Sequence, residues 1–159
     1  MKRAYIALLG RSIWATLNAY YSTAYQGYYP ESVWLVTESR YEEDLTKLDK
    51  GIHIISTGFD FDPTINSIVL EEGDIVEAGV EVRGLIESLK PDYEVALDIT
   101  SARKALVAGT LLATTDCKPD HIYYLMLDTL EDVAKPYPMI PFIHQHLIDL
   151  REQMRRPAI

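Results

Sequence analysis

Apolar strands alternate with helical stretches along most of this chain, and this alternation restricts its fold more than any other feature. The segment Ala4–Leu9 is apolar at nearly every position, which is typical of a central parallel strand that is buried on both faces. Ile13–Gln26 follows it, with apolar residues at helical spacing. Further strands are predicted at Val33–Thr37, Ile52–Ser56, Tyr93–Ile99 and His121–Leu127. This order predicts an α/β fold: a Rossmann-like, doubly wound, mainly parallel sheet with helices on both faces.

The segments between these strands complete a single predicted domain that spans residues 1–159. Helices are expected at 40–48, 73–88, 102–115 and 142–154, a loop at 57–66 and an extended stretch at 137–141. Small residues in the 102–115 helix would allow another backbone to approach it closely. We expect a frayed tail at 155–159. No internal repeat or low-complexity linker divides the chain.

Composition excludes several classes of function. The net charge of −9 argues against binding of long nucleic acid through a broad basic face. No apolar run is long enough to span a bilayer, so we expect no membrane partner. Cys117 is the one cysteine, which excludes an internal disulfide and fits a cytoplasmic protein. His53 and His121 each open a predicted strand, while His144 and His146 fall on different faces of a predicted helix. We therefore expect neither a metal site nor a cofactor.

Two loops share a composition suited to binding phosphate. Gly10-Arg11-Ser12 follows the first predicted strand, and residues 98–104, Asp-Ile-Thr-Ser-Ala-Arg-Lys, follow the fourth. Each combines small hydroxyl residues with cations at the start of a helix, where unpaired backbone N–H groups attract anions. In a doubly wound sheet the first and fourth strands are neighbours at the topological switch point, where such folds bind ligands. The sequence therefore predicts one anion-binding pocket built from both loops.

Helix capping is the alternative interpretation of these loops. Ser12 could cap the 13–26 helix, and Thr100 or Ser101 could cap the 102–115 helix. Capping leaves the cations unexplained, because Arg103 and Lys104 fall in the first helical turn, where each is unfavourable by about 0.3–1 kcal/mol. A bound anion would reverse the sign of that cost.

Asp98 ends its predicted strand close to this pocket. Besides contacting a ligand, it could cap N–H groups of the loop or pair with Arg103 or Lys104. The chain contains no Gly-x-Gly-x-x-Gly and no Gly-Lys-Ser/Thr, so dinucleotide-binding and P-loop interpretations lack their motifs.

The first loop with Trp14, together with the 98–104 motif, resembles the CRISPR-associated Rossmann fold (CARF) domain over nearly the whole chain. CARF domains are dimers that bind cyclic oligoadenylates, the second messengers of type III CRISPR immunity, across their two-fold axis. Stand-alone archaeal ring nucleases of this family carry a serine in the first loop and a lysine in the second, and Ser12 and Lys104 match them. The resemblance implies a homodimer that binds cyclic tetra-adenylate.

The same resemblance implies a metal-independent phosphodiesterase. A ribose 2′-hydroxyl of the ring would attack its adjacent phosphate, giving linear di-adenylate with a 2′,3′-cyclic phosphate and switching the signal off. Ser12 and Lys104 would be catalytic, with Lys104 stabilising charge on the phosphorane and Ser12 positioning the phosphate or the attacking hydroxyl. The implied ligand-binding residues are Gly10, Arg11, Asp98, Thr100, Ser101, Ala102 and Arg103.

A role in binding alone is the main alternative. A non-catalytic CARF sensor would hold the ring intact and regulate a partner or an effector domain. No arginine here is followed by histidine at the Arg-x4–6-His spacing that effector domains of the family often carry, which favours the ring nuclease. A third hypothesis is an unrelated Rossmann-like protein that binds another nucleotide.

Overall fold

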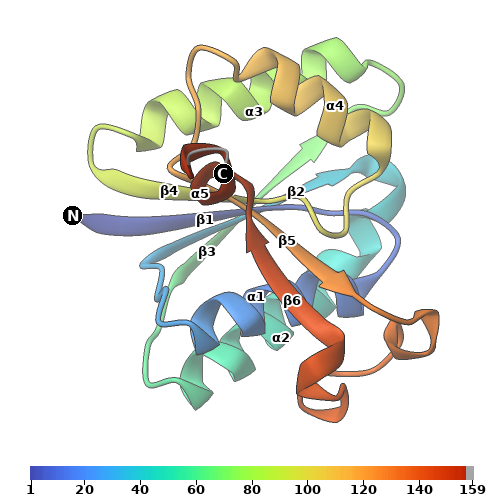
Figure 1. Ribbon diagram of the computed structural model, residues 1–159. Coiled ribbons are helices and arrows are strands. Elements are labelled where there is room, and N and C mark those ends of the chain that lie inside the picture. The colour runs from blue at the N-terminus through green and yellow to red at the C-terminus, as the bar shows by residue number, and fades with distance from the viewer. Residues whose placement is uncertain (157–159) are drawn as a thin grey trace.

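The computed structural model describes residues 1–156 and contains one six-stranded sheet, in the order β3-β2-β1-β4-β5-β6 (Figure 1). Residues 157–159, part of the tail predicted to fray, lie outside the described residues. β1 and β4 are parallel neighbours, paired from Lys2 and Tyr93 to Ala7 and Asp98. This confirms the predicted switch point. The strands are β1 (Lys2–Leu8), β2 (Ser32–Glu38), β3 (Thr64–Leu70), β4 (Tyr93–Asp98), β5 (His121–Leu127) and β6 (Gln145–Asp149).

Helices cover both faces of the sheet (Figure 1). α1 (Ile13–Tyr25) and α2 (Leu45–Gly58) lie on one face, and α3 (Ile75–Leu89) and α4 (Lys104–Ala113) lie on the other. A short helix, α5 (Leu150–Arg155), follows β6. Five strands run parallel to one another and β6 runs antiparallel to β5. The predicted fold class is therefore confirmed. None of the helices within residues 1–156 combines the length and the apolar character that crossing a membrane requires.

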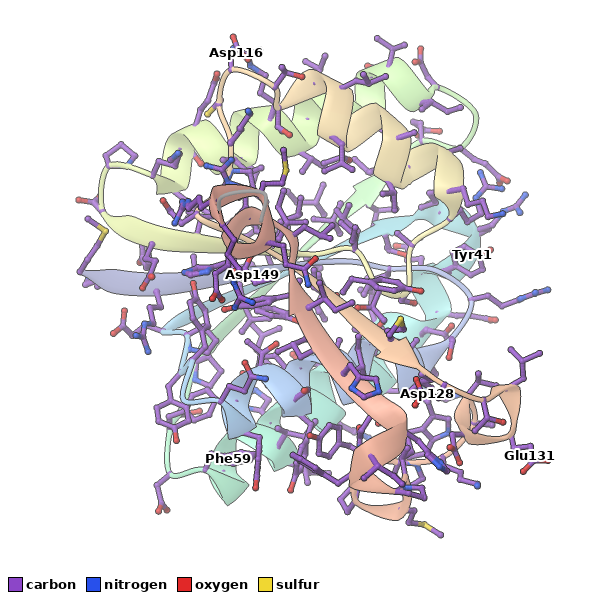
Figure 2. All side chains as sticks on the ribbon, viewed as in Figure 1. Tyr41, Phe59, Asp116, Asp128, Glu131 and Asp149 are labelled. Carbon is purple, nitrogen blue, oxygen red and sulfur yellow. The ribbon has the colours of Figure 1, made fainter. Side chains whose placement is uncertain are left out.

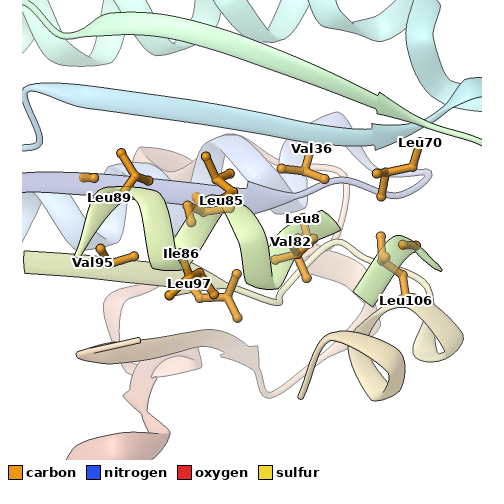
Figure 3. Close-up of a cluster of buried hydrophobic side chains, with 13 residues drawn as sticks. Leu8, Val36, Leu70, Val82, Leu85, Ile86, Leu89, Val95, Leu97 and Leu106 are labelled. Carbon is orange, nitrogen blue, oxygen red and sulfur yellow. The ribbon is translucent and has the colours of Figure 1, made fainter. Parts of the chain in front are cut away.

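Each face of the sheet has its own hydrophobic core, because successive strand residues point to opposite faces. Leu8 and Leu97 point toward α3, where they pack against Val82 and Ile86 (Figure 3). Ile6 belongs to the same cluster. On the other face Tyr5, Ala7 and Leu9 pack beneath α1 and α2, with Tyr20 and Ile52. Burial on both faces explains why the first strand reads as an unbroken apolar run.

Glycines let α3 and α4 pack closely. A Cβ added at Gly109 would lie 2.6 Å from the carbonyl oxygen of Ile75, and one at Gly79 would lie 2.5 Å from that of Gly109. Both distances are shorter than any ordinary contact, so neither position has room for a side chain. The close approach predicted for this helix is thus made to α3, which fixes the position of the α4 N-terminus.

The middle of the chain differs from the prediction. The predicted strand Ile52–Ser56 lies within α2, and β3 begins at Thr64, inside the predicted loop 57–66. Residues 48, 52 and 56 are buried at helical spacing, while Ile54 is 73% exposed, so the isoleucine run belongs to an amphipathic helix. β3 is an edge strand with mixed exposure, which leaves it a weak sequence signal. The helix predicted at 40–48 is a 3-10 segment, Ser39–Asp44, followed by the first turn of α2.

The C-terminal prediction was also wrong in part. The predicted helix 142–154 divides into a 3-10 turn at Phe142–His144, strand β6 and helix α5. β6 pairs with β5, and the Asp149 carboxylate accepts hydrogen bonds from the backbone N–H groups of Arg151 and Glu152. This new N-cap starts a separate helix. The stretch predicted as extended at 137–141 contains a 3-10 turn at Tyr137–Met139. The strand predicted at His121–Leu127 is confirmed with the same bounds.

Candidate functional site

The structure brings the two predicted loops into direct contact at the carboxyl end of β1 and β4. The Gly10 N–H donates a hydrogen bond to the Ser101 hydroxyl oxygen at 3.2 Å, and that hydroxyl donates to the carbonyl of Ser12 at 3.0 Å. A Cβ at Gly10 would lie only 1.9 Å from the carbonyl oxygen of Ser101. Only glycine allows this approach, so Gly10 and Ser101 join the loops into one unit.

The hydroxyl groups of Ser12 and Thr100 serve the loops themselves. Ser12 caps α1, since its Oγ accepts a hydrogen bond from the N–H of Ala15 at 3.1 Å. Thr100 Oγ1 accepts from the N–H of Leu125 at 3.0 Å and donates to the Asp98 carboxylate at 2.5 Å. α4 has Arg103 at its N-cap and no side-chain cap. The capping interpretation is thus correct for Ser12 and wrong for Thr100 and Ser101. The first N–H groups of α4 have no side-chain acceptor among the described residues.

Asp98 is fully buried beneath the second loop. Its Oδ1 accepts hydrogen bonds from the N–H and the hydroxyl of Thr100, which matches the predicted alternative of capping loop N–H groups. It pairs with neither Arg103 nor Lys104. Its Oδ2 is fully enclosed and lies against the Tyr5 hydroxyl, which is enclosed as well. Burial raises the pKa of Asp98 to about 6, although the hydrogen bonds from Thr100 oppose that shift.

The two cations of the 98–104 motif have different surroundings. Arg103 donates from Nε and Nη2 to the two carboxylate oxygens of Glu38, each at 2.8 Å. Glu38 ends β2 and is 6% exposed, so Arg103 is the counter-ion of a buried carboxylate. Lys104 opens α4 and is exposed, and Arg11 is exposed in the first loop. Neither forms an ion pair with any residue in 1–156. These two cations are therefore the ones free to meet an anion.

A pocket of about 290 Å³ opens beside the joined loops, and we refer to it as the carboxyl-end pocket. Ser12 contributes to it from the first loop and Thr100 from the second, so both loops form part of one pocket. The other predicted site residues do not line it, and its binding of an anion stays a prediction. Its walls are mainly apolar, and no charged side chain lines it. The lining residues are Ser12, Ala15, Asn18, Thr100, Tyr124, Leu125, Leu127, Thr129, Leu130 and Val133.

The segment between β5 and β6 closes one side of this pocket. Asp132 is buried in that segment and accepts hydrogen bonds from Lys135 Nζ at 2.6 Å and His144 Nδ1 at 3.3 Å. The Asn18 side chain fastens the segment to α1, because its Nδ2 donates to the carbonyl of Lys135 at 2.8 Å. Figure 2 shows Asp128 and Glu131 on this segment, beyond the end of β5.

Asn18 is a site residue that sequence reasoning missed. It is 3% exposed on α1, among the apolar positions that predict the helix. A polar amide at such a position is unusual, because a buried amide requires hydrogen-bond partners. That signal was available in the sequence, but its partner lies 117 residues further along the chain.

The histidines do not gather at the pocket. His121 opens β5 as predicted and lies between two carboxylates, Asp149 at Nδ1 and Glu94 at Nε2, each at 2.8 Å. Burial lowers its pKa, but the two carboxylates outweigh that effect and hold the pKa above its ordinary value. His53 lies in α2 rather than opening a strand, a consequence of the misplaced third strand. His144 and His146 lie in the 3-10 turn and in β6 rather than on a helix. Within residues 1–156, no cluster of three or more acidic, cysteine or histidine side chains is arranged to hold a metal ion.

Comparison with known proteins gives a likeness in structure alone. No family model and no curated protein matches the sequence. The fold is similar to that of Enterococcus italicus Csm6 bound to cyclic hexa-2′-fluoro-hexa-dAMP, with a TM-score of 0.58 and 15% sequence identity. The match covers 96% of this chain and 42% of the Csm6 chain. The two proteins therefore share a fold, and this chain corresponds to less than half of the Csm6 length.

Proposed function

We propose that this chain is a CARF domain that binds a cyclic oligoadenylate at the carboxyl-end pocket. One observation carries the proposal: two loops joined through Gly10 and Ser101 meet at the switch point, where they contribute to a neutral pocket and carry the exposed, unpaired cations Lys104 and Arg11. The shared fold supports it, because the Csm6 structure contains a bound cyclic oligonucleotide.

The distribution of charge suits the two parts of such a ligand. Arg11, Lys104 and the uncapped N–H groups of α4 would contact phosphates. The neutral pocket would receive a nucleobase. At about 290 Å³ the pocket lies near the lower end of small-molecule sites, about 300 Å³, so it holds one nucleoside rather than a whole ring. We propose that a second copy of the chain completes the site, because an isologous dimer presents each loop twice to a symmetric ring.

We further propose that the protein cleaves cyclic tetra-adenylate. A ribose 2′-oxygen attacks the adjacent phosphorus, its proton passes to water, and the P–O5′ bond breaks as the leaving oxygen takes a proton from water. The Lys104 ammonium stabilises the charge on the phosphorane. The Ser12 oxygen accepts the N–H of Ala15, which leaves its own proton to donate to a phosphate oxygen. The ring supplies its own nucleophile, and the loops align it.

The other assigned residues hold the loops. Gly10 provides the close approach, and the Ser101 hydroxyl links the two loops. Asp98 and Thr100 fix the second loop from below, and Arg103 ties it to Glu38. We therefore assign the direct ligand contacts to Arg11, Ser12, Lys104 and the backbone that follows Ala102.

The non-catalytic sensor remains the second candidate, and one observation favours it. No histidine and no carboxylate lines the carboxyl-end pocket, so general acid–base catalysis by a side chain would have to come from elsewhere. Slow cleavage or none would follow.

The deciding experiment incubates the purified protein with labelled cyclic tetra-adenylate, and separately with cyclic hexa-adenylate, in excess EDTA. Linear di-adenylate with a cyclic phosphate, formed by the wild type and lost in Lys104→Ala, establishes the ring nuclease. Lys118→Ala, which removes another exposed lysine near the opposite end of α4, is the matched control and keeps activity. Tight binding without cleavage identifies a sensor. No binding of either ring refutes the proposal.

A further inference from the structure

Asn18 has one side-chain atom without a partner. Its Nδ2 is held by the Lys135 carbonyl at 2.8 Å, which fixes the orientation of the amide. Its Oδ1 accepts no hydrogen bond from any residue in 1–156, although the residue is 3% exposed. An amide oxygen has two lone pairs and is a strong acceptor, so on a buried residue this unused atom is available to a donor from outside the described residues.

Asn18 lines the carboxyl-end pocket, and a ligand there could reach its Oδ1. The surrounding residues do not enclose it fully, so it keeps some accessible surface. Asn18 also borders a second pocket, between α1, α2 and the Pro136–Pro138 turn, but that pocket presents almost no polar surface. The carboxyl-end pocket does present polar atoms. Of these two pockets, the carboxyl-end pocket is therefore the one from which a ligand could reach Oδ1.

The surroundings favour a neutral, flat group that donates a hydrogen bond. Leu125, Leu127 and Val133 supply apolar wall, and no charged side chain lines the pocket. A phosphate would be desolvated there without a cation, whereas a nucleobase would bury its faces and direct an N–H at Oδ1. Adenine carries an exocyclic amino group that donates, while guanine and hypoxanthine carry an oxygen at the same position.

We propose that Asn18 is the residue that selects adenine, by accepting a hydrogen bond from its exocyclic amino group. This inference rests on the proposed function and adds base recognition to it. An oxo group at that position would place two acceptors face to face, with both left unpaired in a buried site. Selection thus depends on the Lys135 carbonyl as well, because it prevents the amide from turning its NH₂ toward the base.

The test compares binding affinities after changing the base in the ring and, separately, after changing Asn18 in the protein. Dissociation constants are measured for cyclic tetra-adenylate, for the ring with hypoxanthine in place of adenine, and for the ring with N6,N6-dimethyladenine, which has no N–H to donate. The wild type is expected to bind both altered rings about tenfold or more weakly, as for loss of a buried hydrogen bond. In Asn18→Ala the preference over the hypoxanthine ring falls to near one.

Two variants separate recognition from folding. Asn18→Asp keeps an acceptor oxygen and loses the contact to Lys135, so it retains a preference for adenine even if overall affinity drops. Asn66→Ala changes the other asparagine of the chain, on β3, and leaves the preference unchanged. If Asn18→Ala does not fold, the two altered rings still test the wild type.

Each outcome is decisive. Equal affinity of the wild type for all three rings overturns the inference, as does an Asn18→Ala variant that keeps the wild-type preference. Both results leave the proposed function intact, because cyclic tetra-adenylate still binds. Failure of the wild type to bind any ring refutes the proposed function, and the inference with it.

Discussion

At the amino end of the sheet, charged side chains form a closed network. Arg3 pairs with Glu94, and Glu94 and Asp149 hold the two ring nitrogens of His121. Figure 2 shows Asp149 at the junction of β6 and α5. Every charge in this network meets an opposite one, and together they fasten β4, β5 and β6. The network needs no ligand to explain its composition.

The carboxyl end of the same sheet is incomplete by comparison. Lys104 and Arg11 are exposed there without an ion pair in residues 1–156. Such violations of local rules are expected where a ligand supplies the missing partner. The paired end thus stabilises the fold, while a ligand is expected to bind at the unpaired end.

Gly10→Ala is expected to have the largest effect, because it separates the loops on which the unpaired end depends. The new methyl group would lie 1.9 Å from the Ser101 carbonyl oxygen, and relieving that overlap should cost about 3 kcal/mol of stability or more. Ligand binding should be lost as well. Chemical denaturation measures the first effect and calorimetry the second. Gly84→Ala, where an added Cβ meets nothing, should instead stabilise α3 slightly.

Lys104 and Arg103, adjacent in sequence, should give opposite phenotypes. Lys104→Ala should lower activity or affinity about 10²–10³-fold and leave stability unchanged or raised by about 0.3–1 kcal/mol, since a cation at a helix N-terminus is unfavourable. Arg103→Ala should cost about 2 kcal/mol of stability, because it leaves the buried Glu38 carboxylate without its counter-ion. A Lys104→Ala variant that unfolds more easily would contradict the division between the two ends.

His121→Gln tests the paired end. Removing the cation between Glu94 and Asp149 should cost about 2 kcal/mol at pH 6. Because the folded-state pKa of His121 is raised, its contribution is full below about pH 6.5 and is lost as pH rises through the folded pKa. Urea unfolding between pH 5.5 and 9 should show this slope in the wild type alone. His53→Gln removes looser contacts on exposed α2 and should change stability by less than about 0.5 kcal/mol.

Asp98→Asn should have the smallest effect on stability at acidic pH. Its effect develops over a lower pH range than that of His121→Gln. Burial raises the pKa of Asp98 to about 6, so the folded state holds this proton more tightly than the unfolded chain does. Wild-type stability should therefore fall as pH rises from about 4 to about 6. The asparagine variant should lack that slope. Thermal melts across this range measure it, and a slope that persists in the variant would assign it to another group.

The sequence predicted the positions of the two loops of the candidate site, because the signals for them are local, but it did not predict the contacts between distant segments. The loop around Ser12 and the motif ending in Lys104 each follow an apolar strand, and their neighbours in the chain determine their position. The contacts of Arg103 with Glu38 and of Asn18 with Lys135 join distant segments, and no spacing rule predicts them. Their consequences, one cation neutralised and one amide fixed, were therefore absent from the sequence-based prediction.

The errors in the predicted fold also arise where contacts between distant segments determine the structure. A central strand such as β1 is buried on both faces, so its unbroken apolar run is recognisable in the sequence. β3 and β6 at the edges are only partly buried and lack such a run. A loop was predicted where β3 begins, and a helix was predicted in place of β6. Whether such a segment forms a strand depends on its pairing with a neighbouring strand, and pairing is a property of the assembled sheet.

The reversed direction of β6 has a practical consequence. It returns the chain from the carboxyl end of the sheet to the amino end, where β1 also begins (Figure 1). Both termini of the described chain thus lie away from Gly10 and Lys104. A fluorophore, an affinity tag or a surface linker attached at Met1 would therefore lie away from the carboxyl-end pocket, which suits this domain to use as an immobilised sensor for its ligand.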